Sequence, residues 1–227
     1  FDEILILKDL ISENFSNKHH IIFGTNRFNE KKNKYYNSML IVNNQLEVIQ
    51  SYNKRKLVPF GEFLPNEEFF NKFGLKKITE GYGSYLKGSE NNNLLLNELN
   101  ILPMICYEII FNNLIYKSIK DTNLIINISE DGWFGKTIGP DQHFAKSIFR
   151  AIESNTFLLR SANKGVSAII DNKGNIIKEL NRNEAGSIDF EVPLIKSNKI
   201  KNDLIFLILL ITYLLFFQLL KEKNAKK

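Results

Sequence analysis

Two short segments of this chain hold the residue types of a nucleophilic acyl-transfer site. Cys106 is the only cysteine; it follows an apolar run and precedes Glu108 by two residues. Lys54 and Glu62 lie upstream, in the basic segment 52–62 (YNKRKLVPFGE). A thiol with an ordinary pKa, about 8.5, is mostly protonated at neutral pH and needs a base or a cation beside it to attack a carbonyl. A thiol, an ammonium group and two carboxylates together supply these needs.

Each of these residues also has a structural interpretation. A lone cysteine that ends an apolar strand is often a small core residue. Lys54 could be a solvated surface lysine, and Glu62 could be a loop carboxylate. The apolar residues 57–60 between them instead favour a segment packed against a core. In a catalytic site, Lys54 would stabilise the thiolate and the tetrahedral oxyanion, and the backbone N–H of Tyr107 would be a second oxyanion donor. Glu62 and Glu108 would orient the lysine or transfer a proton.

Other kinds of site find little support. The histidines His19, His20 and His143 precede a strand or open a helix, so we expect structural or solvated roles for them. The chain has no metal-ligand spacing and no glycine-rich phosphate loop, and we expect no metal and no cofactor. Trp133 stands in a loop flanked by glycines. It is either a plug of the core or a lid over a hydrophobic substrate.

Composition and hydropathy indicate a membrane-attached globular domain. The 227 residues are 44% hydrophobic and carry a net charge of +5, to which a lysine-rich tail contributes, so we expect no nucleic-acid partner. The run 204–220 contains no charged residue. It predicts a transmembrane helix at 203–220, although a buried core helix is the alternative. The basic tail 221–227 would be cytoplasmic by the positive-inside rule.

Hydrophobic periodicity predicts alternating strands and helices, which is typical of an α/β domain with mixed sheets. The junction after the strand at 101–105 places Cys106 on a sharp turn, where backbone N–H groups face the same space. A polar linker is expected at 193–202. The predicted helices are 1–15, 67–73, 109–120 and 142–155, and the predicted strands are 20–24, 36–42, 46–52, 94–96, 101–105, 123–129, 157–160, 166–171, 175–180 and 187–192.

Several motifs resemble those of the bacterial apolipoprotein N-acyltransferase family, a branch of the nitrilase, or carbon-nitrogen hydrolase, superfamily. Residues 54–62 (KRKLVPFGE) resemble the family's lysine segment, and residues 105–108 (ICYE) resemble its nucleophile segment. These two motifs in combination separate the family from the wider superfamily. Further matches in order and spacing are 131–135 (DGWFG), 139–143 (GPDQH), 150–153 (RAIE) and 159–165 (LRSANKG).

The resemblance implies a nitrilase-like αββα sandwich over 1–192, the linker 193–202, a transmembrane helix at 203–220 and a cytoplasmic tail at 221–227. The domain would lie on the periplasmic side of the bacterial inner membrane. The implied reaction is ping-pong, in which Cys106 takes an acyl chain from a phospholipid as a thioester. The chain then passes to the α-amino group of a diacylglyceryl-cysteine apolipoprotein.

The resemblance also implies residue roles. Cys106 is the nucleophile, Lys54 the oxyanion stabiliser, and Glu62 and Glu108 are supporting carboxylates. Tyr107 and Trp133 would contact substrate. The sequence departs from the family at Lys56, where histidine is frequent, and at Glu130, where asparagine is frequent. The family's general-base glutamate precedes the lysine segment, and no residue here matches it, so we expect it upstream of this chain.

Two other functions stay open. A nitrilase-type amidase acting on a small amide would share the glutamate, lysine and cysteine plan. A membrane-anchored interaction module without activity would explain the missing base, although the joint presence of Lys54, Glu62, Cys106 and Glu108 argues against it.

Overall fold

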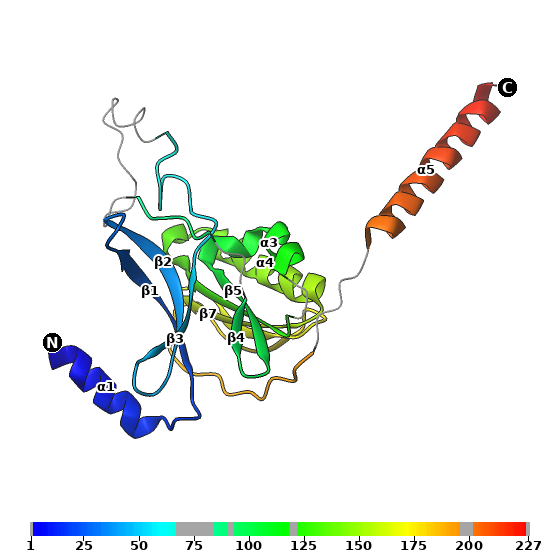
Figure 1. Ribbon diagram of the computed structural model, residues 1–227. Helices are drawn as coiled ribbons and strands as arrows, with labels where there is room; N and C mark the ends of the chain where they lie inside the picture. The colour runs from blue at the N-terminus through cyan, green and yellow to red at the C-terminus, as the bar shows by residue number, and fades with distance from the viewer. Residues whose placement is uncertain (1, 67–83, 90–92, 119–121, 196–201, 226–227) are drawn as a thin grey trace. The chain divides into compact units, whose positions relative to one another are not determined.

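A computed structural model describes residues 2–66, 84–89, 93–118, 122–195 and 202–225 (Figure 1). The chain divides into a unit of residues 1–197 and a unit of residues 198–227. Every element that positions the predicted site belongs to the first unit. The predicted helix at 67–73, with its phenylalanines, lies outside the described residues.

The smaller sheet of the described region is antiparallel, with the strand order β1-β2-β3. Its strands are β1 (Ile21–Asn29), β2 (Lys34–Val42) and β3 (Val48–Asn53). The hairpin predicted for β2 and β3 is confirmed. The prediction of a short buried strand at 20–24 is wrong in length and in burial, because β1 has nine residues and many are exposed. Strand β1 pairs with β2 along its whole length, from Ile21 opposite Val42 to Asn29 opposite Lys34.

The larger sheet has the order β4-β5-β6-β7-β8-β9 and is mixed, as predicted. Strands β5, β6 and β7 run parallel in its centre, while β4, β8 and β9 join antiparallel at the edges. The bounds are β4 (Leu94–Leu96), β5 (Leu99–Ile105), β6 (Leu124–Glu130), β7 (Phe157–Asn163), β8 (Ser167–Ile170) and β9 (Ile176–Leu180). Parallel strands place their carboxyl ends at one edge, where Cys106 and Glu130 emerge.

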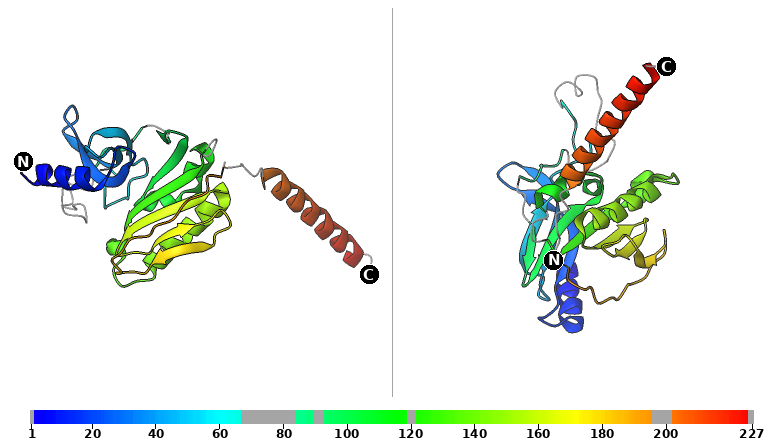
Figure 2. Two further views of the ribbon diagram at one scale, coloured as in Figure 1. Left: turned by 90° about the horizontal axis from the view of Figure 1, so that it is seen from below. Right: turned by 90° about the vertical axis from the view of Figure 1, so that its right-hand side faces the viewer.

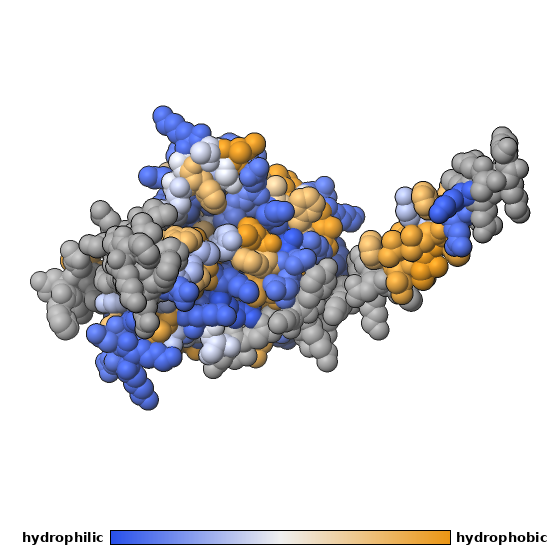
Figure 3. Space-filling view, turned by 90° about the horizontal axis from the view of Figure 1, so that it is seen from above, coloured by the Kyte–Doolittle hydropathy of each residue, from blue (hydrophilic) through white to orange (hydrophobic). Residues whose placement is uncertain are grey.

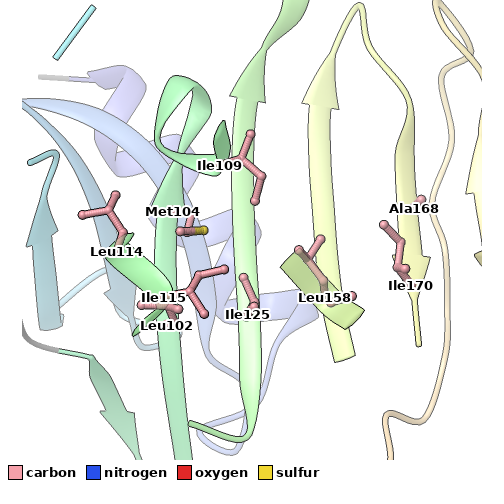
Figure 4. Close-up of a cluster of buried hydrophobic side chains, with 10 residues drawn as sticks. Leu102, Met104, Ile109, Leu114, Ile115, Ile125, Leu158, Ala168 and Ile170 are labelled. Carbon is pink, nitrogen blue, oxygen red and sulfur yellow. The ribbon is translucent and has the colours of Figure 1, made fainter. Parts of the chain in front are cut away.

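Two apolar clusters hold the layers together. One lies between the larger sheet and the helices α3 (Asn112–Ser118) and α4 (Gly139–Ser154); it contains Leu102, Ile115 and Leu158 (Figure 4). The second joins Met39 and Ile41 of the smaller sheet to strands of the larger one. Figure 2 shows the blue strands of the smaller sheet beside the green and yellow strands of the larger sheet. The described residues therefore form sheet, sheet and helix layers of the predicted nitrilase-like sandwich.

The segment 187–192, predicted as a closing strand, is not a strand. Its residues have no assigned secondary structure. Ile188 and Val192, together with Ile195, nevertheless pack against the cluster between the sheets. The prediction of a strand is therefore wrong, although part of the segment packs on the core.

Two helices flank the sandwich in sequence. Helix α1 (Asp2–Asn14) matches the predicted first helix, and Ile6, Leu7 and Leu10 on it are exposed. Helix α5 (Asn202–Ala225) belongs to the second unit, and its described apolar side chains are exposed (orange in Figure 3). Among the described residues, no helix is both long enough and apolar enough to cross a membrane. The transmembrane helix predicted at 203–220 is therefore not confirmed.

Candidate active site

Cys106 sits on a strained turn directly after β5. It is the first residue of the 3₁₀-helix η1 (Cys106–Ile110), and its φ of 49° lies in the left-handed region. A residue other than glycine seldom adopts this conformation, and its presence is common where a side chain must be aimed at a site. The thiol is free and half-buried. This is the sharp strand-to-helix junction expected from the sequence.

A cavity of about 740 Å³ opens beside Cys106. Its lining includes Lys54, Glu62, Tyr107 and Trp133, so the fold brings five of the six predicted site residues together. The rest of the lining is largely apolar, from Ile22, Phe23, Ile105, Ile128 and Phe134 among others. The volume lies within the range of sites that bind small molecules or cofactors, roughly 300–1,000 Å³.

Lys54 and Glu62 form a buried ion pair in this cavity. The Lys54 side chain is 1% exposed, and its Nζ lies 2.8 Å from Glu62 Oε1. Asn37 Nδ2 donates to the same oxygen at 2.8 Å, and the Val58 amide donates to Oε2 at 2.8 Å. The alternatives of a solvated lysine and a free loop carboxylate are therefore wrong. A buried ammonium held by one carboxylate is a fixed positive charge, suited to stabilising an anion.

The backbone between the two residues brings them together. The Glu62 amide donates to the Val58 carbonyl, and the Phe60 amide donates to the Phe63 carbonyl, both at 2.8 Å. Phe60 has a φ of 61°, which reverses the chain. The amide of Lys54 is itself held by the Asn37 carbonyl at 2.8 Å. Asn37 of β2 thus contacts both ends of the segment, a role that the sequence did not indicate.

Glu108 is fully buried and is absent from the described lining of the cavity. Its Oε1 accepts from the Tyr52 hydroxyl and from the amides of Arg55 and Lys56, at 2.7 to 3.0 Å. Its Oε2 accepts from the Ile105 amide at 2.9 Å. Burial raises the pKa of Glu108 against the effect of these donors. The carboxyl group therefore connects the start of the lysine segment to the residue before the nucleophile.

A second buried network contacts the backbone of Cys106. Asp131 accepts from Arg160 Nη2 at 2.6 Å, and its Oδ1 lies 2.9 Å from His143 Nδ1. His143 Nε2 lies 3.1 Å from the Cys106 carbonyl oxygen. Burial raises the pKa of Asp131, but the hydrogen bond from His143 and the charge of Arg160 outweigh it and hold the value at about 2. His143 is buried and structural, one of the roles expected for it.

This network was missed as part of the site. One sequence signal is a charged residue, Arg160, at the end of the apolar strand segment 157–159. Another is that the motifs 131–135, 139–143 and 159–165 contain the three residues of the network. A charge in a buried strand requires a partner, which the sequence does not identify.

Trp133 of the 3₁₀-helix η2 (Asp131–Phe134) lines the cavity but is 67% exposed, so the interpretation as a core plug is wrong.

Comparison with known proteins places the chain in a family. The family model for carbon-nitrogen hydrolases matches residues 7–201. The chain belongs to the carbon-nitrogen hydrolase family. This member is 41% identical over 160 residues to the apolipoprotein N-acyltransferase of Rhizobium leguminosarum bv. trifolii, which covers 70% of this chain and 30% of that protein. It is 40% identical over 159 residues to the enzyme of the same name from Rhodopseudomonas palustris, with the same coverage. The resemblance stated from the motifs is confirmed.

Solved structures support the fold of this carbon-nitrogen hydrolase. Nit3 of Saccharomyces cerevisiae, of the nitrilase superfamily, superposes with a TM-score of 0.57 at 19% identity, covering 80% of this chain and 62% of that one. An amidase from Nesterenkonia sp. AN1 gives 0.56 at 14% identity, covering 80% and 65%. At such identities the likeness shows the fold alone. The chain spans about a third of the length of the curated relatives that it matches.

Proposed function

We propose that this chain carries the nucleophile and the oxyanion-stabilising cation of an apolipoprotein N-acyltransferase. The observation that carries the proposal is the shared cavity, in which Cys106 on its strained turn meets the buried pair of Lys54 and Glu62. The sequence identity of 41% to a protein of that name supports the choice of reaction.

The reaction has two steps, acylation of Cys106 and transfer of the acyl chain to an amine. The Cys106 thiol gives its proton to a base, and the thiolate attacks the ester carbonyl of a phospholipid to form a C–S bond. The C–O bond breaks, and the base returns the proton to the oxygen of the leaving lysophospholipid. The α-amine of a diacylglyceryl-cysteine apolipoprotein then attacks the thioester, forming a C–N bond. The C–S bond breaks, the amine loses a proton and the thiol is regenerated. Both steps pass through an oxyanion, which a fixed cation stabilises.

The described residues fit separate roles in these steps. Lys54 stabilises the oxyanion, and Glu62 holds the lysine in place. The backbone N–H of Tyr107 is the proposed second donor. Glu108 acts by positioning, since its oxygens accept from backbone amides of both catalytic segments. Trp133 is a contact for the acyl chain in the cavity.

A phospholipid donor requires access to a bilayer. The apolar run 204–220, in the helix α5, is our candidate for membrane attachment, and the lysine-rich residues after it are our candidate for a cytoplasmic tail. The catalytic unit would then lie at the periplasmic face of the inner membrane. This attachment rests on the sequence pattern and on the resemblance.

An amidase acting on a small amide is the second candidate, because the chain belongs to the carbon-nitrogen hydrolase family. The size and apolar walls of the cavity favour a long acyl chain over a small amide.

The test is the intact mass of the full-length protein after incubation with phospholipid. We expect an acyl adduct that neutral hydroxylamine removes and that is absent from Cys106→Ala. An equal adduct on Cys106→Ala would overturn the proposal. Rapid hydrolysis of a small amide without any lipid adduct would favour the amidase.

A further inference from the structure

Glu130 is a second carboxylate in the cavity, and nothing in the proposed acyl transfer uses it. It is the last residue of β6, and its half-buried side chain lines the cavity together with Cys106 and Lys54. The fold holds its carboxylate in place. Oε1 accepts from the Gly132 amide at 2.8 Å, and Oε2 accepts from Asn163 Nδ2 at 2.5 Å.

The charges of the cavity do not balance within the described residues. Its lining there contains one basic side chain, Lys54, and two carboxylates, Glu62 and Glu130. Lys54 is bound to Glu62. Around Glu130, the described part of the chain places no basic nitrogen within 4 Å. The exposed Lys164 side chain passes Gly132 next to this carboxylate without pairing with it. The hydrogen-bond donors to Glu130 are neutral, and its negative charge faces a largely apolar cavity, an arrangement that favours a cationic ligand.

The free hydrogen-bonding capacity of Glu130 indicates which cation fits. A carboxylate offers about four lone-pair sites, of which Gly132 and Asn163 occupy two. The remaining sites match a primary ammonium, a compact group with three N–H donors. A quaternary ammonium has no N–H to donate and fits less well.

We propose that Glu130 binds the primary ammonium group of a substrate in this cavity. The inference rests on the proposed function for the identity of that substrate. Two molecules of the reaction can carry the group: the acceptor, through its α-amine, and a phospholipid donor that has an ethanolamine headgroup. In the first case the bound ammonium loses a proton before the amine attacks the thioester, so Glu130 positions the nucleophile. In the second case Glu130 binds a headgroup apart from the reacting ester and determines specificity alone.

The test is equilibrium binding to the full-length protein in a Cys106→Ala background, where no acyl transfer can occur. Each probe is paired with an N-acetylated form that lacks the ammonium group: a diacylglyceryl-cysteine peptide with its N-acetyl form, and phosphatidylethanolamine with its N-acetyl derivative, which keeps the phosphate charge. Ion-pair hydrogen bonds contribute about 1.5–3 kcal/mol, so we expect the member with the free ammonium group to bind about 10- to 100-fold more tightly in one of the pairs. Glu130→Gln should remove this preference, and Glu130→Asp should retain part of it.

The control variant is Glu179→Gln, which neutralises an exposed carboxylate of β9 outside the cavity lining. Structural damage by Glu130→Gln would weaken both members of a pair alike and leave their ratio unchanged. Loss of the ratio for the peptide pair identifies the acceptor, and loss for the lipid pair identifies the donor. If neither pair shows a preference, or if Glu130→Gln retains it, the inference is overturned. The acyl adduct on Cys106 is measured separately, so failure of the proposed function remains distinguishable.

Discussion

The buried pair of Lys54 and Glu62 allows stability and catalysis to be separated by one double-mutant cycle. Lys54→Met keeps an unbranched stem but leaves the Glu62 carboxylate with neutral donors from Asn37 and Val58. Removing one partner of a buried pair costs about 3–5 kcal/mol, because the other charge stays buried and uncompensated. Glu62 is 14% exposed, so water screens it in part and we expect the lower value, about 3 kcal/mol.

The double variant Lys54→Met, Glu62→Gln should recover most of this loss, because replacing both members of a buried pair by neutral groups is often harmless. Thermal unfolding of the full-length protein in detergent, followed by near-ultraviolet circular dichroism, measures the effect. For a domain of this size, about 3 kcal/mol corresponds to a fall in Tm of about 6–12 °C for Lys54→Met. The control is Lys56→Ala, whose side chain lies over the Phe111 ring and outside the pair, so we expect a mild effect.

Acylation of Cys106 distinguishes a catalytic lysine from a structural one. If Lys54 stabilises the oxyanion, the double variant remains folded but acylates about 100- to 1,000-fold more slowly than wild type, as measured by intact mass over time. If its acylation rate returns to the wild-type value along with its stability, Lys54 is only a structural partner of Glu62. That result would refute the catalytic assignment.

Three further predictions concern the buried networks. The pKa of Asp131 is about 2 instead of the ordinary 3.8, so its ionised form contributes about 2 kcal/mol to the free energy of unfolding. This contribution should be complete above pH 4 and lost as the pH falls through 2. Acid unfolding of Asp131→Asn should lack this loss. Glu108→Gln should lower the free energy of unfolding by about 1–3 kcal/mol in thermal melts, since its amide would face the Ile105 N–H; an unchanged Tm would contradict this. Gly165→Ala should lower the Tm, because its Cβ would overlap the Asp131 carboxylate, and Gly186→Ala, with looser contacts, is the comparison.

Local sequence features predicted the elements and the nucleophile because they act over a few residues. Apolar segments separated by turn residues predicted the hairpin of β2 and β3 and the central strands of a mixed sheet. The junction at Cys106 followed from an apolar strand that meets a polar turn. The motifs at 54–62 and 105–108 predicted the family, which the comparisons confirm.

Only the tertiary structure decided which charges are buried and how they are paired. Glu108 contacts Arg55, 53 positions away, and His143 contacts Cys106, 37 positions away. Such contacts depend on how the strands assemble, and no local pattern encodes them. For the same reason the segment 187–192 was wrongly predicted as a strand, since a strand needs a neighbour with free backbone groups. The unpaired charge of Glu130 is also visible only in the fold. It depends on the pairing of Lys54, the basic residue of the described cavity lining, with Glu62 instead of Glu130.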